Sequence, residues 1–258
     1  MKQEDNPNKR KIQPGDVFDT YEGEQVVVLE YRNALDVLVK HLDEHGHIRS
    51  VRAYHLKEGR VKNPYKRTAS GVGYIGHGKY KPSKGRVYSK AYKVWTDMLH
   101  RVYSEKALGK DKSYVGCSVC EEWHNFQNFA EWYYQQPNAE SSGFHLDKDL
   151  IKWGNKVYCP EACSLVPEAV NSILTGSPSC KKDLPRGVYK KGNKYGAGIS
   201  VKKKREHLGT YDTIEEARSV YEEAKRDHIK RVVDEHKDVL DPRVYENLIN
   251  WKLEYLED

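Results

Sequence analysis

Residues 14–63 alternate between apolar and polar positions in short runs, as the strands of a half-buried sheet do. The runs QVVVLEY, ALDVLVKHL and IRSVRAYHL are rich in β-branched residues, and turn residues separate them. Three or four short strands in this space predict a small barrel or a curled meander. Residues 1–13, ahead of these strands, are polar and charged, and we expect a disordered tail there.

Two later segments, 89–108 and 121–136, repeat their apolar residues every three or four positions, which is the period of an amphipathic helix. The repeating residues are Tyr92, Trp95, Leu99 and Val102 in the first segment, and Trp123, Phe126, Ala130 and Tyr133 in the second. Aromatic stripes at this spacing face a core. Residues 64–87, ahead of the first helix, hold five glycines and two prolines, which predicts a basic Gly-rich linker or an ordered loop.

The last part of the chain predicts a three-stranded antiparallel sheet backed by a helix. Its strands are expected at 186–190, 194–201 and 206–211. Thr213 and Glu216 have the spacing of a capping box at the start of the helix. A short final helix over 241–252 is expected to dock Leu248 and Trp251 against this unit.

Composition excludes some classes of protein. Hydrophobic residues are 38% and charged residues 32% of the 258 residues, and no apolar run approaches the ~20 residues of a membrane span. The first residues lack the apolar stretch of a signal peptide, and five cysteines do not suggest a secreted disulfide framework. We therefore expect a cytoplasmic protein without a membrane partner.

Positive charge is concentrated in two stretches. Residues 57–93 carry eleven Lys and Arg against Glu58 alone, and residues 181–205 carry ten against Asp183 alone. Such charge, interleaved with Tyr and Gly, is what a phosphate backbone attracts. Double-stranded DNA is therefore the expected partner, with solvated surface loops as the plainer alternative.

The segment His-Leu-Asp-Lys-Asp, residues 145–149, carries candidate chemistry. On a strand, His145, Asp147 and Asp149 would share one face. Carboxylates suit hard cations such as Mg²⁺ or Mn²⁺, and a histidine can accept a proton from water. Pro167 suits the first turn of a helix, and Asn171 about one turn later could reach the same cation. The alternative is a set of surface polar residues on a hairpin and a helix.

The stretch LDKDLIKWGNKVYCPEACSLVP, followed by Asn171, resembles the HNH endonuclease motif of the ββα-metal fold. The upstream run KAYKVWTDMLHRVYSEK…VGCSVCEEWHNFQNFAEWY resembles the helical lead-in of phage-type HNH proteins. The final piece, RGVYKKGNKYGAGISV…HLGTYDTIEEARSVYEEAK, resembles the AP2 DNA-binding domain that often follows HNH modules. The order of these pieces, over most of residues 15–235, is more specific than any one of them.

The resemblance implies a nuclease in which one Mg²⁺ lies under the scissile phosphate and a histidine activates water. Asp147 matches the acidic metal ligand and Asn171 the last ligand. In this register Lys148 stands where the family has its base histidine, whereas His145 is the base in the other register. Ala162 stands where the family has the asparagine that orients the histidine. The catalytic candidates are therefore His145, Asp147 and Lys148, and the metal candidates are Asp147, Asp149 and Asn171.

Four cysteines form two closely spaced pairs, Cys117 with Cys120 and Cys159 with Cys163. Four thiolates would suit a structural Zn²⁺ that joins the lead-in to the hairpin. Buried thiols are the alternative. Cys180 has no evident role.

The sheet of the final piece is the expected DNA-reading surface, because strands can enter the major groove and present Lys and Arg to phosphates and base edges. The candidates are Arg186, Tyr189, Lys194, Tyr195, Lys202, Lys203, Lys204 and Arg205.

The expected fold is α+β and multi-domain. It comprises the tail (1–13), the β barrel or meander (14–63), the basic linker (64–87), an HNH-like ββα-metal domain with its helical lead-in (88–176) and an AP2-like domain (177–258). The leading function is a phage-type, metal-dependent DNA endonuclease that works in the host cytoplasm if phage-encoded. A second function is a catalytically inactive HNH/AP2-type DNA-binding protein that acts as a regulator or as an inhibitor of a host factor, which would make a host protein its partner. A third is an interaction module for an acidic protein.

Overall fold

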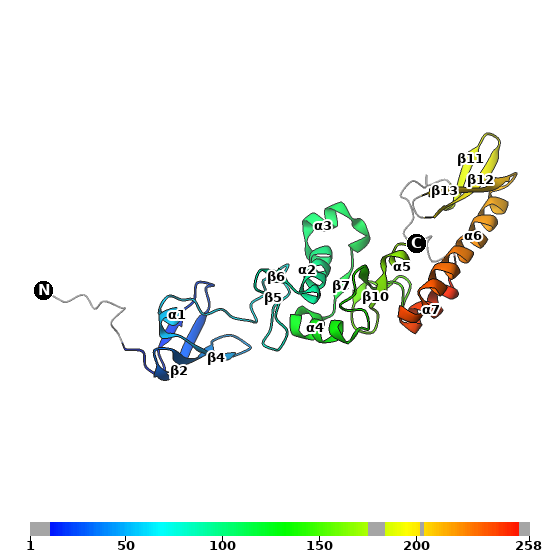
Figure 1. Cartoon of the computed structure of the whole chain (residues 1–258). Helices are drawn as coiled ribbons and strands as arrows, with labels where there is room; N and C mark the ends of the chain where they lie inside the picture. Colours follow the sequence, from blue (N-terminus) through cyan, green and yellow to red (C-terminus); the bar gives the residue numbers. More distant parts are fainter. Residues whose placement is uncertain (1–10, 175–183, 202–203, 253–258) are drawn as a thin grey trace. The chain divides into compact units, whose positions relative to one another are not determined.

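The structure, a computed structural model, describes residues 11–174, 184–201 and 204–252. It is a mixed α and β protein with several small sheets (Figure 1). The chain divides into two compact units, one made of residues up to 68 with 73–78 and the other of 69–72 with the chain from Lys79 onward. In the part of the chain that is described, no helix is long and apolar enough to cross a membrane.

The first unit is a four-stranded antiparallel meander. Its elements are β1 (Val17–Asp19), β2 (Gln25–Asn33), β3 (Asp36–His41), β4 (Ile48–Val51) and the short helix α1 (Ala53–Lys57). The strands pair in chain order, and among the described residues β1 does not pair with β4, so the sheet is a meander and not a closed barrel. The expected third strand ends early, because Ala53 to Lys57 turn into a helix that buries Leu56 in the core.

Alternation in β2 and β3 builds this core, since Val26, Val28, Val37 and Val39 are all fully buried on one face. Ile12 is buried with them, so the expected disordered tail 1–13 already contributes to the core at its end. Residues 1–10 of that tail lie outside the described residues. The stretch after α1, where a basic linker or an ordered loop was expected from residue 64, packs on the meander at its start. The ring of Tyr65 stacks on that of His45, with ring centroids 4.4 Å apart.

The second unit begins with a short hairpin and two helices. The elements are β5 (Ser83–Lys84), β6 (Val87–Tyr88), α2 (Lys90–Tyr103), α3 (Glu105–Lys110), the 3₁₀ turns η2 (Lys112–Tyr114) and η3 (Glu121–His124), β7 (Ser118–Val119) and α4 (Phe126–Gln135). Helices α2 and α4 pack through the aromatic stripes that the sequence predicts, with Trp95, Trp123, Phe126 and Phe129 fully buried. The indole N–H of Trp95 donates to the carbonyl of Trp123 at 2.7 Å, which joins the two helical segments.

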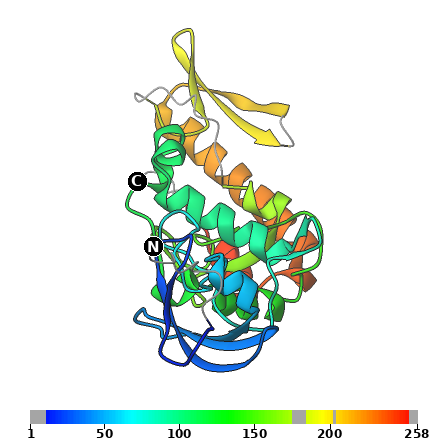
Figure 2. The same cartoon turned by 90° about the vertical axis from the view of Figure 1, so that its left-hand side faces the viewer.

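The rest of the unit holds the candidate sites. Its elements are β8 (Phe144–Asp147), β9 (Val157–Tyr158), β10 (Ser164–Pro167), α5 (Glu168–Asn171), β11 (Val188–Lys191), β12 (Lys194–Val201), β13 (Lys204–Tyr211), α6 (Ile214–Glu235), η4 (Lys237–Val239) and α7 (Pro242–Ile249). Strands β11, β12 and β13 form one antiparallel sheet, and α6 contacts all three (Figure 2). The capping box of Thr213 and Glu216 is present, as predicted.

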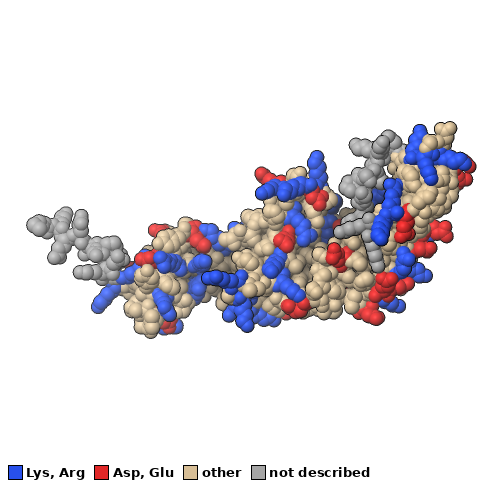
Figure 3. All heavy atoms as spheres, turned by 45° about the horizontal axis from the view of Figure 1, so that its top comes forward, with Lys and Arg blue, Asp and Glu red and all other residues tan. Residues whose placement is uncertain are grey.

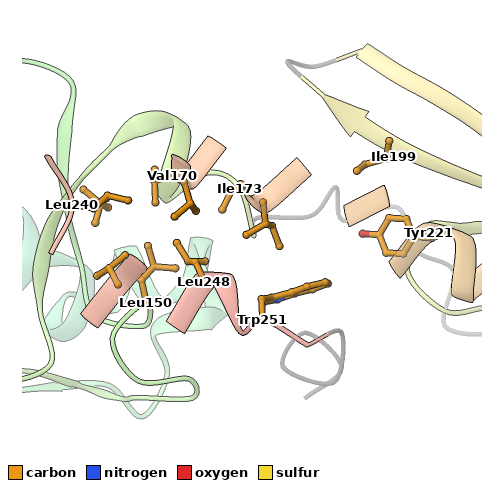
Figure 4. Packing of buried hydrophobic residues seen from close by; sticks show 12 residues of the cluster. Leu150, Val170, Ile173, Ile199, Tyr221, Leu240, Leu248 and Trp251 are labelled. Carbon is orange, nitrogen blue, oxygen red and sulfur yellow. The ribbon is translucent and has the colours of Figure 1, made fainter. Parts of the chain in front are cut away.

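One hydrophobic core joins the hairpin of β8 and β10 to the C-terminal helices (Figure 4). Leu150, Val166, Val170 and Ile173 from the first part pack with Ile229, Val233, Leu248 and Trp251 from the second. The expected boundary at residue 177 therefore does not separate two cores, because both parts bury their apolar faces against each other.

A buried lysine adds a polar link between the same two parts. The ammonium group of Lys225, on α6, donates to the carbonyl of Ile173 just after α5. Burial and, to a lesser extent, the charge of the nearby Arg186 lower the pKa of Lys225 to about 8. A side chain from 52 residues away in the chain thus provides a hydrogen-bond donor for a carbonyl just beyond the end of α5.

Candidate functional site

The first candidate site is a strand–strand–helix unit made of β8, β10 and α5. Strands β8 and β10 are antiparallel, with His145 opposite Val166 and Asp147 opposite Ser164. Helix α5 follows β10 directly and contacts both strands, and the amide of Glu168 donates to the carbonyl of Gly143 at 2.9 Å. Asp147 at the end of β8 and Asn171 at the end of α5 are therefore brought into one small unit.

The shared face predicted for this segment is confirmed for His145 and Asp147 and is wrong for Asp149. Strand β8 ends at Asp147, so Asp149 follows in the turn beyond the strand. His145 is exposed, whereas Asp147 is half-buried. Val157–Tyr158, the segment nearest in sequence after the turn, forms β9 and pairs with β7 in parallel, and β10 is the strand beside β8.

The carboxylate of Asp147 organises the turn that follows it. Its Oδ1 atom accepts the amides of Asp149 at 2.8 Å and Leu150 at 2.7 Å. Burial raises the pKa of Asp147, and these two hydrogen bonds oppose the rise. Because burial disfavours the charged form of a carboxylate, a nearby cation or a bound proton would stabilise Asp147.

Lys148 is a buried side chain with a full set of acceptors. Its ammonium group contacts both carboxylate oxygens of Asp149 at 2.7 and 2.8 Å and the carbonyl of Asn155 at 3.0 Å. The side-chain amide of Asn155 in turn donates to the backbone carbonyls of Lys148 and Val157. Lys148 therefore closes the loop between β8 and β9, and Asp149 is committed to it.

The side chains near Asp147 meet part of the requirement of a magnesium site. Mg²⁺ is usually held by one or two carboxylates, with waters and substrate phosphates completing its shell. Asp147 is a carboxylate of the required kind, and the side-chain oxygen of Asn171, on the adjacent helix α5, would have to supply the second ligand. Within the described ranges, no three His, Cys, Asp or Glu side chains are placed to hold a metal ion by themselves, so bound phosphate would have to share the coordination.

The paired cysteines meet where β7 and β9 run side by side. Cys117 and Cys120 flank β7, and Cys159 directly follows β9. Burial raises the pKa of Cys120 to about 11 and raises that of Cys159 and of Cys163, which is almost fully buried. The thiol of Cys117 donates to the carbonyl of Ser113 at 3.8 Å, and among the described residues no three of these thiols are placed to hold a metal ion.

The four-cysteine zinc site stays a prediction, and it requires the four thiols to move into a common coordination sphere. If it forms, protein purified without added zinc should carry about one ion per chain, and chelation should lower its melting temperature. Cys117→Ser should release the ion. Cys180→Ser is the matched control, at a position outside the described residues, and should retain it. Metal analysis that finds no zinc would leave four ordinary thiols.

The second candidate site is the face of the β11–β13 sheet that α6 does not cover. Ala197 and Ile199 point to the helix and are buried, so Gly196 and Gly198, which alternate with them along β12, belong to the outer face. Strand pairing places Tyr189 opposite Gly196, and His207 opposite Gly198. Ser200 pairs with Arg205 on the same face.

The predicted DNA-binding residues divide between the two faces. Tyr189 and Arg205 lie on the outer face, whereas Tyr195 packs on the helix side and Arg186 donates to the carbonyl of Leu174 at 3.4 Å. Lys194 is exposed and paired with Asp212 at 2.8 Å. Lys204 is exposed at the start of β13. Lys202 and Lys203 lie outside the described residues. Figure 3 shows Lys and Arg side chains gathered at the sheet end of this unit.

Sequence reasoning missed three residues of this face: Lys191, His207 and Thr210. The hydroxyl of Tyr189 lies 2.6 Å from Nδ1 of His207, and Thr210 Oγ1 lies 3.4 Å from the other ring nitrogen. Strict alternation would put residues three apart on opposite faces. A register shift between Ala197 and Gly198 removes that constraint and puts both on the outer face.

Comparisons of this chain with protein families, with curated proteins and with solved structures give no match.

Proposed function

We propose that this chain is a DNA endonuclease of the HNH type, which holds duplex DNA with its C-terminal AP2-like sheet and hydrolyses a phosphodiester bond at the β8–β10–α5 unit. The observation that carries the proposal is Asp147. It is a half-buried carboxylate at the end of a strand, with an exposed histidine on the same face and an asparagine-bearing helix packed against that strand.

In this proposal Asp147 and Asn171 hold Mg²⁺ or Mn²⁺, which would neutralise charge that develops on the phosphate and the leaving oxygen. Asp147 keeps one oxygen in the turn through the amides of Asp149 and Leu150, which fixes the direction of the carboxylate. His145 is exposed and can accept a proton from water. Lys148 holds the loop through Asp149, and no proton transfer is assigned to it.

A second function has its own support. Lys148 stands where the family has its base histidine, yet its ammonium group is buried and paired with Asp149. Ala162, at the position of the orienting asparagine, is buried and has no side-chain polar atom. These two residues favour a DNA-binding protein without catalysis, acting as a regulator or as an inhibitor of a host factor.

Both functions require DNA binding by the sheet, which a salt titration tests. Replacing Lys191 and Arg205, which lie exposed on the outer face, by alanine should flatten the log–log dependence of affinity on salt by about 2, since each phosphate contact contributes about 0.9 on duplex DNA. The control has the same charge change at two exposed lysines elsewhere, Lys110 and Lys112. Equal slopes for the two double variants would exclude the sheet as the DNA-binding surface and make the basic stretch at 57–93 the next candidate.

A further inference from the structure

We propose that the β5–β6 hairpin is a second DNA-contacting element, which enters the minor groove of a duplex with Val87 as an apolar wedge between base pairs. The proposal rests on the proposed function, because it assumes that the chain binds duplex DNA. It goes further by assigning a contact outside the β11–β13 sheet and a bend that this contact imposes on the DNA. Three features of the hairpin support it: its attachment, its unpaired positive charge and its exposed apolar side chain.

The hairpin is short, and its tip projects from the helices. Strands β5 and β6 pair over two residues each, so only Gly85 and Arg86 form the loop between them. Gly85 has a φ of 62°, which glycine adopts without strain. A Cβ atom built on Gly85 would meet nothing within 4 Å. The tip can therefore approach another molecule without displacing any part of the described unit.

Both ends of the hairpin are anchored to helices. On the entering side, Oε1 of the buried Gln127 on α4 accepts from the amide of Tyr80 at 3.0 Å, and its Nε2 donates to the Tyr80 carbonyl at 2.9 Å. The ring of Tyr80 also stacks on that of Tyr134, with ring centroids 5.4 Å apart. On the leaving side, the amide of Ser89 donates to the carbonyl of Pro82 at 2.8 Å, and the Ser89 hydroxyl caps α2 (Figure 1). A hairpin held in this way loses little conformational freedom when it binds.

Positive charge on and around the hairpin is mostly unpaired. Residues 79–93 contain six Lys and Arg and no Asp or Glu. Lys79 pairs with Glu131 at 2.9 Å, and Lys90 donates to the carbonyl of Glu140. The other four are exposed, and no described residue forms an ion pair or a hydrogen bond with their charged groups: Lys81, Lys84, Arg86 and Lys93. Such charge is complementary to the phosphates that line both sides of a DNA groove.

The two faces of the hairpin differ. Cross-strand pairing puts Lys84 and Val87 on one face and Tyr88 on the other. The ring of Tyr88 lies 5.3 Å from that of Tyr92 on α2, so the face with Val87 points away from this helix. Val87 is 69% exposed. The hairpin thus presents an apolar side chain to solvent between a lysine and an arginine.

An exposed valine contributes nothing to a phosphate contact, so it indicates a contact with the bases. Proteins that bind the minor groove insert apolar side chains of this kind between base steps and kink the duplex, while neighbouring Lys and Arg side chains contact the groove. In the major groove, Val87 would contact at most a thymine methyl group and would leave the duplex straight. The two placements therefore differ in the bend of the bound DNA.

A salt titration tests the charge of the hairpin. Replacing Lys84 and Arg86 together by alanine should flatten the log–log dependence of duplex affinity on salt by about 2, since each phosphate contact contributes about 0.9. The matched control is the Lys110 and Lys112 double alanine variant, which has the same change of charge and should keep the wild-type slope. All four positions are exposed, so both variants should keep the wild-type melting temperature.

Energy transfer between dyes at the two ends of a short duplex tests the wedge. Binding of the wild-type chain should bend the duplex by about 20° or more. Val87→Ser should remove most of this bend and keep the wild-type salt slope, because it changes no charge. Val115→Ser is the matched control, since Val115 is 58% exposed elsewhere in the same unit, and it should bend the duplex as the wild type does.

An unchanged salt slope in the Lys84 and Arg86 double variant would overturn the inference and leave the proposed function intact, and an acidic protein would then be the better partner for the hairpin. A straight duplex with the wild-type chain, or a bend that Val87→Ser retains, would overturn insertion into the minor groove. Failure of the wild-type chain to bind any duplex would overturn the proposed function together with the inference.

Discussion

Asp147→Asn is expected to lower the rate of Mg²⁺-dependent nicking of supercoiled plasmid by on the order of 100-fold, with DNA affinity unchanged. The carboxamide loses the negative charge that would hold the cation. It retains an oxygen that can accept the amides of Asp149 and Leu150, so the turn after β8 should persist. Asparagine therefore tests the charge of Asp147 alone. Alanine would also remove the oxygen that accepts the two amides of the turn.

The matched control is Asp149→Asn, which makes the same change of charge two residues away. It weakens the pair with Lys148 and leaves Asp147 in place, so nicking should survive. Equal nicking by wild type and Asp147→Asn, or nicking that persists in EDTA, would point to a contaminating nuclease. DNA binding without nicking in either Mg²⁺ or Mn²⁺ would favour the catalytically inactive alternative.

Trp251→Ala is expected to reduce the free energy of unfolding by about 3 to 5 kcal/mol, as truncation of a fully buried tryptophan does. Trp251 is 1% exposed and packs in the core shared by the β8–β10–α5 unit and the C-terminal helices (Figure 4). No described residue accepts its indole N–H, so its contribution is packing. Both parts should therefore lose stability together in one urea transition.

Hydrogen exchange can locate the effect of Trp251→Ala. Protection should fall at Val166 in β10 and at Ala197 in β12, which lie in different parts of the same unit. Val239→Ala, at a residue 38% exposed, is the control and should change stability little. If β10 kept its protection while the C-terminal part unfolded, the two parts would be independent domains. A chain cut near residue 176 would lose eight of the twelve buried residues of this shared core, so truncation cannot separate DNA binding from folding.

The sequence predicted the elements whose stability is local. The valine alternation in β2 and β3, the aromatic stripes of α2 and α4, and the capping box of Thr213 and Glu216 all form as expected. Each depends on residues within a few positions of one another, and periodicity expresses such contacts directly. Helix ends were less well predicted: the helix expected over 89–108 ends at Tyr103, and α3 begins again at Glu105.

For the candidate site, the sequence identified Asp147 and its face with His145, and it identified the basic sheet that carries Arg205. It could not give the partner of Lys148, because the ion pair with Asp149 depends on where β8 ends. It could not place His207 beside Tyr189 either, since that depends on a register shift between two strands. The pattern of a single sequence indicates which residues of a strand or helix share a face. Which side chains then contact each other depends on strand register and on where each strand ends.

The sequence by itself therefore determined the order of short strands and helices, the concentration of positive charge near the C-terminus and the residue types available for chemistry. Only the tertiary structure decided that β8 pairs with β10, that Val157–Tyr158 joins β7 instead, and that the last helices complete the core under Leu150 and Val170. Periodicity tells which face of an element is apolar. It does not tell which other apolar face will cover it, because several pairings would bury similar area and the choice depends on packing across the whole unit.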